Sequence, residues 1–88
     1  MKTVSIQNIT IANDRPFTLI AGPCQMESRE HAFDMCGALK EMTDKLGIPF
    51  IYKTSFDKAN RTSLSGKRGM GLDDSLPVFA DIKKEFGC

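Results

Sequence analysis

The chain has 88 residues, of which 41% are hydrophobic and 26% are charged, and its formal net charge is +1 at pH 7. This is the composition of one small globular domain, and so small a net charge argues against a nucleic-acid-binding domain, which usually carries a broad basic surface. The sequence also lacks a signal-peptide core, an apolar run of membrane-spanning length and a CxxC pair, so we expect a cytoplasmic protein whose three cysteines are free thiols or single metal ligands.

The first part of the chain predicts a hairpin followed by a buried strand. Val4 to Ile6 and Ile9 to Ile11 show the period-2 alternation of strands, and Gln7-Asn8 between them is the expected turn. Phe17 to Ala21 is a nearly continuous apolar run, which is typical of a parallel strand buried on both faces. Gly22-Pro23 is expected to end this strand sharply.

A helix is predicted next, with Ser28 as its N-cap and Gly47 as its C′ residue. Its apolar residues recur at helical spacing and are expected to form one buried face. These residues are Ala32, Met35, Cys36, Leu39, Met42 and Leu46. Ile48 to Tyr52 is a second apolar run of strand length.

The end of the chain predicts a second helix. Pro77 is tolerated only in a first helical turn, so we expect the helix to begin near Asp73 or Asp74 and to end at Gly87. Its apolar residues also recur at helical spacing. They are Leu72, Leu76, Phe79, Ile82 and Phe86.

The stretch from Tyr52 to Gly71, "YKTSFDKANRTSLSGKRGMG", predicts a phosphate-binding loop. It holds five cations against the single acid Asp57, and we expect these cations to hold two different anions. The cations are Lys53, Lys58, Arg61, Lys67 and Arg68. Hydroxyl and amide donors are interleaved with them at Thr54, Ser55, Asn60, Thr62, Ser63 and Ser65. Gly66, Gly69 and Gly71 would let backbone N–H groups approach a ligand. The alternative is a solvated basic loop.

The order of the predicted elements describes the beginning of an α/β fold. Two strand–helix units follow a hairpin, and the candidate ligand loop begins at the carboxyl end of a strand. Two parallel strands with one helix each cannot cover both faces of a sheet, and a (β/α)₈ barrel takes roughly 250 residues. We therefore expect the chain to be part of a longer protein.

Three motifs resemble one enzyme family. They are "IAGPCQMES" at Ile20 to Ser28, "YKTSFDKANRTS" at Tyr52 to Ser63 and "RGMGL" at Arg68 to Leu72. Together they resemble the 3-deoxy-D-manno-octulosonate 8-phosphate synthases, also called 2-dehydro-3-deoxyphosphooctonate aldolases. The resemblance covers essentially the whole chain and corresponds to the N-terminal third of such an enzyme.

The resemblance implies a TIM (β/α)₈ barrel with an N-terminal β-hairpin, of which residues 1–88 are the first portion. Residues 1–16 would be the hairpin, residues 17–47 the first βα unit and residues 48–88 the second, with the substrate loop at 53–71. The family commonly forms homotetramers. Its reaction condenses phosphoenolpyruvate with arabinose 5-phosphate and water, releases phosphate and supplies a lipopolysaccharide precursor. We expect no nucleic-acid or membrane partner.

The resemblance also implies roles for residues of the loop. Lys53, Ser55 and Lys58 match positions that hold phosphoenolpyruvate, and Lys58 matches a catalytic position close to the reacting carbons. Asn60 matches a contact to the pentose hydroxyls. The Arg61-Thr62 pair matches the clamp on the phosphate of arabinose 5-phosphate. The composition of the loop independently predicts the same arrangement, in which separate cations hold two anions.

Cys24 follows Gly-Pro, where the metal-dependent enzymes of this family have cysteine and the metal-independent ones have asparagine. The resemblance therefore implies a divalent ion such as zinc, iron or manganese with Cys24 as a ligand, and other ligands beyond Cys88. His31 matches none of those ligands, and we interpret it as an exposed or capping residue. The alternative for Cys24 is a small buried thiol beside a turn.

Two other functions remain open from the sequence. The 3-deoxy-D-arabino-heptulosonate 7-phosphate synthases run the same condensation on erythrose 4-phosphate, but they typically have Lys-Pro-Arg-Thr-Ser where this chain has Lys58 to Ser63, so Asn60 favours the longer sugar. The second alternative is a non-catalytic fragment that binds anions or RNA. The shortage of aromatic residues in the loop argues against this alternative. We expect the 88 residues alone to be inactive, because the rest of the site would be missing.

Overall fold

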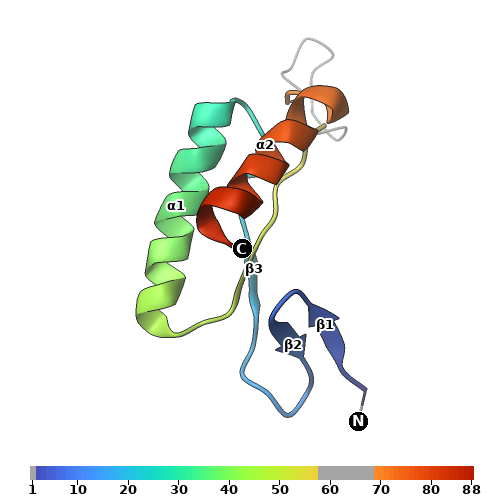
Figure 1. Ribbon diagram of the computed structural model, residues 1–88, viewed down its shortest axis with the longest axis vertical. Coiled ribbons are helices and arrows are strands. Elements are labelled where there is room, and N and C mark those ends of the chain that lie inside the picture. Colours follow the sequence, from blue (N-terminus) through green and yellow to red (C-terminus); the bar gives the residue numbers. More distant parts are fainter. Residues whose placement is uncertain (1, 58–68) are drawn as a thin grey trace.

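The computed structural model describes residues 2–57 and 69–88 (Figure 1). In these ranges the elements are strands β1 (Val4–Ile6), β2 (Ile9–Ile11) and β3 (Leu19–Ala21), helix α1 (Arg29–Leu46), strand β4 (Phe50–Tyr52) and helix α2 (Leu72–Phe86). This mixture of strands and helices is the predicted α/β arrangement. Neither helix of the described ranges is long and apolar enough to cross a membrane.

The strands form two separate pairs. β1 and β2 are antiparallel with Ser5 opposite Thr10, which confirms the predicted hairpin. β3 and β4 are parallel with Ile20 opposite Ile51, as expected of two consecutive strand–helix units. In Figure 1 the hairpin lies below α2, at the lower end of the molecule.

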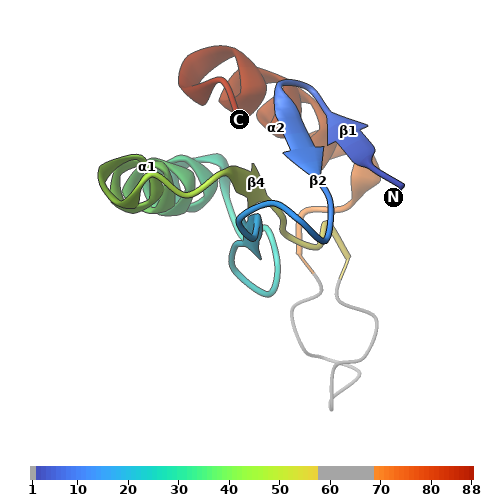
Figure 2. The ribbon, with the colours of Figure 1, turned by 90° about the horizontal axis from the view of Figure 1, so that it is seen from below.

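The helices α1 and α2 lie side by side (Figure 1, Figure 2) and bury one face of the β3–β4 pair. The core residues of the described ranges come from both helices, from β4 and from the turn after β3. They are Met26, Ala32, Cys36, Phe50, Val78 and Ile82. The Phe33 and Phe86 rings join the helices at a centroid distance of 5.8 Å. Arg29 and Asp81 add an ion pair of 2.6 Å, but both side chains are about half-exposed, so it contributes less than about 1 kcal/mol.

The predicted buried face of α1 is partly wrong. Ala32 and Cys36 are buried, but Met42 and Leu46 are 52% and 72% exposed. Thr43 is buried in their place, with its hydroxyl bonded to the Leu39 carbonyl at 2.9 Å. The apolar stripe is wider than the contact with one neighbouring helix, so its outer residues stay uncovered in the described part of the chain.

A similar correction applies to α2. Val78 and Ile82 are buried, whereas Leu72 and Leu76 are exposed, although the spacing predicted both leucines for the buried face. The helix begins at Leu72, so Pro77 lies beyond the first turn, contrary to the prediction. Proline has no N–H to donate to the carbonyl four residues earlier, so one helical hydrogen bond is missing there.

The predicted helix caps are confirmed. The Ser28 hydroxyl accepts from the His31 N–H at 3.0 Å. Gly47 and Gly87 both follow their helices in the left-handed conformation, at φ angles of 67° and 71°, which glycine adopts without strain. These local rules fix where α1 begins and where both helices end, and thus how the chain returns to the sheet.

The stability of this core is expected to fall in alkaline solution because of Tyr52. Burial raises the pKa of Tyr52 from 10.0 to about 12, and the neighbouring Cys36 and Cys88 thiols add to the rise. The folded protein thus favours the neutral phenol, so this stabilisation is complete below pH 10 and is lost as the pH rises to about 12.

Tyr52→Phe removes the titrating group, so the free energy of unfolding of this variant is expected to decline less over the same alkaline range. Urea unfolding at a series of pH values measures the difference. All other residues are the same in the two proteins, so the difference between the two pH profiles reports on the Tyr52 hydroxyl. Parallel pH profiles for the two proteins would contradict the prediction.

Candidate functional site

The candidate site lies where β3 and β4 end, and the alternation of β4 orients it. Phe50 and Tyr52 pack toward the helices as part of the core or against it. Strand geometry therefore directs Ile51 and Lys53 to the opposite face, which the helices leave bare. Lys53 is exposed, and Ile20, which pairs with Ile51 on the neighbouring strand, is 58% exposed. A lysine thus stands at the carboxyl end of an apolar, uncovered sheet face.

Backbone hydrogen bonds continue the pairing of the two chain segments beyond the strands. The Lys53 N–H donates to the Ala21 carbonyl at 3.0 Å, and the Met26 N–H donates to the Ser55 carbonyl at 2.7 Å. Gln25 and Ser55 form an isolated parallel bridge. The backbone of Lys53 and Ser55 is therefore held against the turn that follows β3.

Thr54 has a different role from the predicted one. The loop composition suggested its hydroxyl as a ligand donor, but the side chain is buried and donates to the Pro23 carbonyl at 2.8 Å. This bond joins the turn after β3 to the segment after β4, between Lys53 and Ser55. Thr54 thus supports the two neighbouring residues and is not free to bind an anion.

Gly22 is required by close packing of the two strand ends. A Cβ atom built at Gly22 would lie 1.8 Å from the carbonyl oxygen of Lys53, which no side chain can tolerate. The absence of a side chain therefore lets the turn after β3 approach the backbone of Lys53. From the sequence, Gly22-Pro23 was predicted only to end a strand. No sequence pattern indicated that Gly22 packs against the backbone of Lys53.

Two further hydrogen bonds hold the C-terminal flank of the predicted loop, one to the turn after β3 and one to the N-terminal flank. The Met70 N–H donates to the Met26 carbonyl at 3.0 Å, and the Gly71 N–H donates to the Phe56 carbonyl at 2.9 Å. Gly69 has a φ of 105°, and a Cβ there would lie 2.7 Å from the Phe56 carbonyl oxygen. Gly71 was expected to offer its N–H to a ligand, but that group is bonded within the protein.

The other predicted loop residues are not among those that the structure describes. Lys58, Asn60, Arg61 and Thr62 fall within residues 58–68, outside the described ranges. Of the predicted substrate-binding residues, Lys53 and Ser55 are therefore the two with a described position. Ser55 is partly exposed and lies two residues after Lys53 on the same strand extension.

Cys24 lies in the turn after β3 and is exposed, which contradicts the alternative of a small buried thiol. Within residues 2–57 and 69–88, no three His, Cys, Asp or Glu side chains lie close enough together to hold a metal ion. The exposed thiol fits a single ligand position, so a metal here would need ligands from outside these ranges. His31 is partly buried and contributes its backbone N–H to the Ser28 cap.

A cavity of the described part lies elsewhere, between the hairpin and the helix ends. It has a volume of about 420 Å³ and is lined by the hairpin turn and by the ends of both helices, including Arg15, Lys40 and Asp44. None of Cys24, Lys53 and Ser55 lines it. The candidate site is therefore separate from this cavity, and its Lys53, Cys24 and Ile20 side chains are exposed in the described ranges.

Comparison with known proteins gives one consistent result. The family model described as "DAHP synthetase I family" matches residues 1–88. The chain is 69% identical over 85 residues to a 2-dehydro-3-deoxyphosphooctonate aldolase of Brucella anthropi, covering 97% of this chain and 31% of that protein. Proteins with the same name match at 68% identity in Chelativorans sp., covering 96% and 30%, and at 65% in Brucella ovis, covering 97% and 31%. The chain therefore spans about a third of the length of these relatives.

Proposed function

This chain belongs to the DAHP synthetase I family, and on that premise we propose that the full-length protein is a 3-deoxy-D-manno-octulosonate 8-phosphate synthase. The observation that carries the proposal is the 69% identity to a 2-dehydro-3-deoxyphosphooctonate aldolase over 97% of the chain. The enzyme would condense phosphoenolpyruvate with D-arabinose 5-phosphate and water, as a step toward lipopolysaccharide. We also propose the complete (β/α)₈ barrel, divided along the chain as the sequence predicts, and a cytoplasmic homotetramer.

In the proposed reaction, carbon 3 of phosphoenolpyruvate forms a bond to the aldehyde carbon of the pentose phosphate. Water adds at carbon 2, and inorganic phosphate leaves. Phosphoenolpyruvate carries a carboxylate and a phosphate, whose mutual repulsion opposes binding unless cations lie close by. Lys53 and Lys58 would supply these cations, and Ser55 would add a hydrogen bond.

The second substrate would be held by the residues that follow. Asn60 would contact the pentose hydroxyls, and Arg61 with Thr62 would bind the sugar phosphate, since a guanidinium forms paired hydrogen bonds with phosphate oxygens. Holding both substrates in one site raises their effective concentration, which a two-substrate condensation requires. The hydrogen bond from the Gly71 N–H to the Phe56 carbonyl supports this part of the proposal because it holds together the two described segments on either side of residues 58–68.

Cys24 would be one ligand of a divalent metal ion such as zinc, iron or manganese. The exposure of its thiol beside the backbone of Lys53 and Ser55 supports this assignment. When bound, such an ion would orient or activate the water that adds to carbon 2. The deprotonated sulfur of Cys24 would be the contribution of this chain, because a thiolate and not a thiol binds metals.

Phosphate release from phosphoenolpyruvate by the full-length protein tests the proposal. With arabinose 5-phosphate we expect release that EDTA abolishes and a divalent metal restores. Release that EDTA leaves unchanged would retain the enzyme but contradict the metal role of Cys24. Release only with erythrose 4-phosphate would identify the heptulosonate synthase instead, and no release with either sugar would contradict both enzymes.

A further inference from the structure

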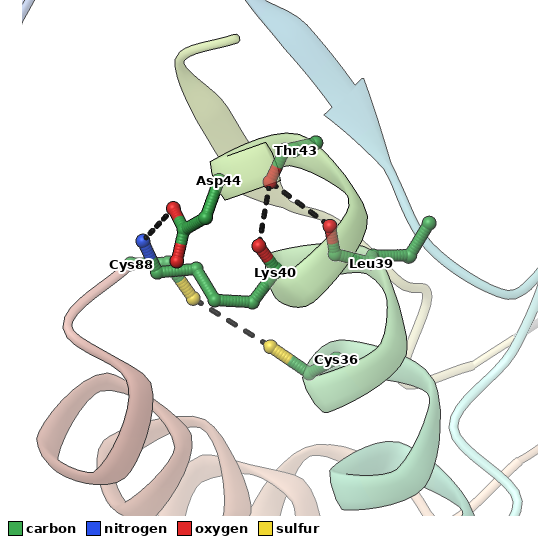
Figure 3. A network of polar contacts seen from close by, with 6 residues as sticks. All are labelled: Cys36, Leu39, Lys40, Thr43, Asp44 and Cys88. Carbon is green, nitrogen blue, oxygen red and sulfur yellow. Dashed lines mark hydrogen bonds and ion pairs between the residues drawn. The ribbon is translucent and has the colours of Figure 1, made fainter. Parts of the chain in front are cut away.

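Two cysteine thiols lie together where α1 meets the residue after α2. The sulfur atoms of Cys36 and Cys88 are 3.6 Å apart, although the residues are 52 positions apart in the sequence (Figure 3). Cys36 is fully buried, and Cys88 packs against the same core while keeping part of its surface exposed. The proposed reaction uses neither thiol.

We propose that Cys36 and Cys88 form a reversible disulfide when the protein meets hydrogen peroxide, and that this bond ties the end of α2 to the middle of α1. The two sulfur atoms must close from 3.6 Å to about 2.05 Å. Cys88 follows Gly87, the left-handed residue that ends α2, so it lies outside the helix. The required movement therefore falls on a residue that helical hydrogen bonds do not hold.

Within the described ranges Cys88 is more exposed than Cys36, and this difference assigns the two thiols different parts in the reaction. The more exposed Cys88 reacts first: its thiolate attacks one oxygen of the peroxide, the O–O bond breaks, and hydroxide leaves a sulfenic acid behind. The Cys36 sulfur then attacks the Cys88 sulfur, an S–S bond replaces the S–O bond, and the Cys36 proton leaves with the oxygen as water. In total, two thiols and one peroxide give one disulfide and two waters, with the sulfurs oxidised and the peroxide reduced.

The surroundings of Cys36 agree with the role of second thiol. Burial raises the pKa of Cys36 to about 12, and the contact with Cys88 adds to the rise, whereas the charge of Lys40 opposes it. Cys36 is therefore a neutral thiol at ordinary pH and a poor target for peroxide in solution. Its attack on Cys88 relies instead on the 3.6 Å contact between the sulfur atoms and on transfer of its proton to the departing oxygen. Lys40 is paired with Asp44 at 2.8 Å on the neighbouring turn of α1 (Figure 3). Both thiols also contribute to the raised pKa of Tyr52.

Peptide mapping of the full-length protein after peroxide treatment tests the inference. Free thiols are blocked by alkylation, and we expect a cross-linked peptide pair containing Cys36 and Cys88 that dithiothreitol separates. The bond closes a long loop, so we also expect the melting temperature to rise on oxidation and to return on reduction. A disulfide from either thiol to Cys24 would overturn the inference, as would peroxide-treated protein in which Cys36 and Cys88 both remain open to alkylation.

Two variants separate the steps of the reaction. In Cys36→Ala the sulfenic acid on Cys88 lacks the Cys36 thiol that would consume it, so dimedone labelling of Cys88 is expected to rise severalfold above the wild-type level. In Cys88→Ser we expect Cys36 to stay unmodified at the same peroxide dose. Oxidation of Cys36 in Cys88→Ser at the wild-type rate would overturn the assigned order. Because Cys88 is less buried than Cys36, the fold of Cys88→Ser is expected to be less affected than that of Cys36→Ala.

Discussion

Lys53→Ala in the full-length protein is expected to lower kcat/KM for phosphoenolpyruvate by about 100- to 1,000-fold, the usual effect of removing a group that stabilises charge in an active site. Lys53 stands at the carboxyl end of β4 on the face that the helices leave bare. The Lys53 N–H donates a hydrogen bond to the Ala21 carbonyl, so the main chain at Lys53 is held in place. Steady-state phosphate release at varied phosphoenolpyruvate concentration measures the loss.

The matched control is Lys84→Ala, which removes the same charge from an exposed position on α2. It is expected to leave kcat/KM within about twofold of wild type, because an exposed charge outside the site is screened by salt. If Lys53→Ala and Lys84→Ala behave alike, Lys53 has no role in binding phosphoenolpyruvate. The family assignment would stand, since it rests on the comparisons.

Gly22→Ala is expected to destabilise the full-length protein by about 3 kcal/mol and to reduce its activity as well. The new Cβ would lie 1.8 Å from the Lys53 carbonyl oxygen, which is backbone and cannot rotate away. The turn after β3 and the backbone of Lys53 must therefore separate, which displaces a proposed substrate ligand. Urea unfolding measures the first effect, and phosphate release in the folded fraction measures the second.

Gly37→Ala is the matched control for the added methyl group. Gly37 lies inside α1, and its Cβ would meet only the edge of the Phe86 ring at 3.4 Å. Alanine favours a helix over glycine, so this variant is expected to gain up to about 1 kcal/mol in the free energy of unfolding. Equal stability of the two alanine variants would show that the Gly22 contact with Lys53 does not constrain the strand ends.

The fold was predictable from the sequence wherever local rules decide it. The Ser28 cap, the left-handed Gly47 and the parallel pairing of β3 with β4 all follow from neighbouring residues or from the order of elements. The buried faces of the helices were less predictable, because Met42 and Leu46 satisfy the apolar spacing without meeting a partner in the described ranges. Periodicity identifies a stripe but not the elements that cover it.

The candidate site was likewise predictable where local rules decide it and unpredictable where distant segments meet. The position of Lys53 follows from the alternation along β4, which can be read from the sequence once the strand is recognised. The roles of Thr54 and Gly22 depend on contacts between segments about 30 positions apart, here the Thr54 bond to Pro23, whose separation is 31. Composition suggested that Thr54 was a ligand donor because a free hydroxyl and a bonded one look the same in a sequence.

The bare face of the β3–β4 pair has a consequence for quality control in the cell. Ile20 and Ile51 line that face, and the sheet has just these two strands in the described part of the chain, so apolar surface and unpaired strand edges are exposed together. Such surfaces promote association between chains. A protein product cut short after this segment would therefore be a substrate for chaperones and proteases, and its cellular level would be set by degradation more than by synthesis.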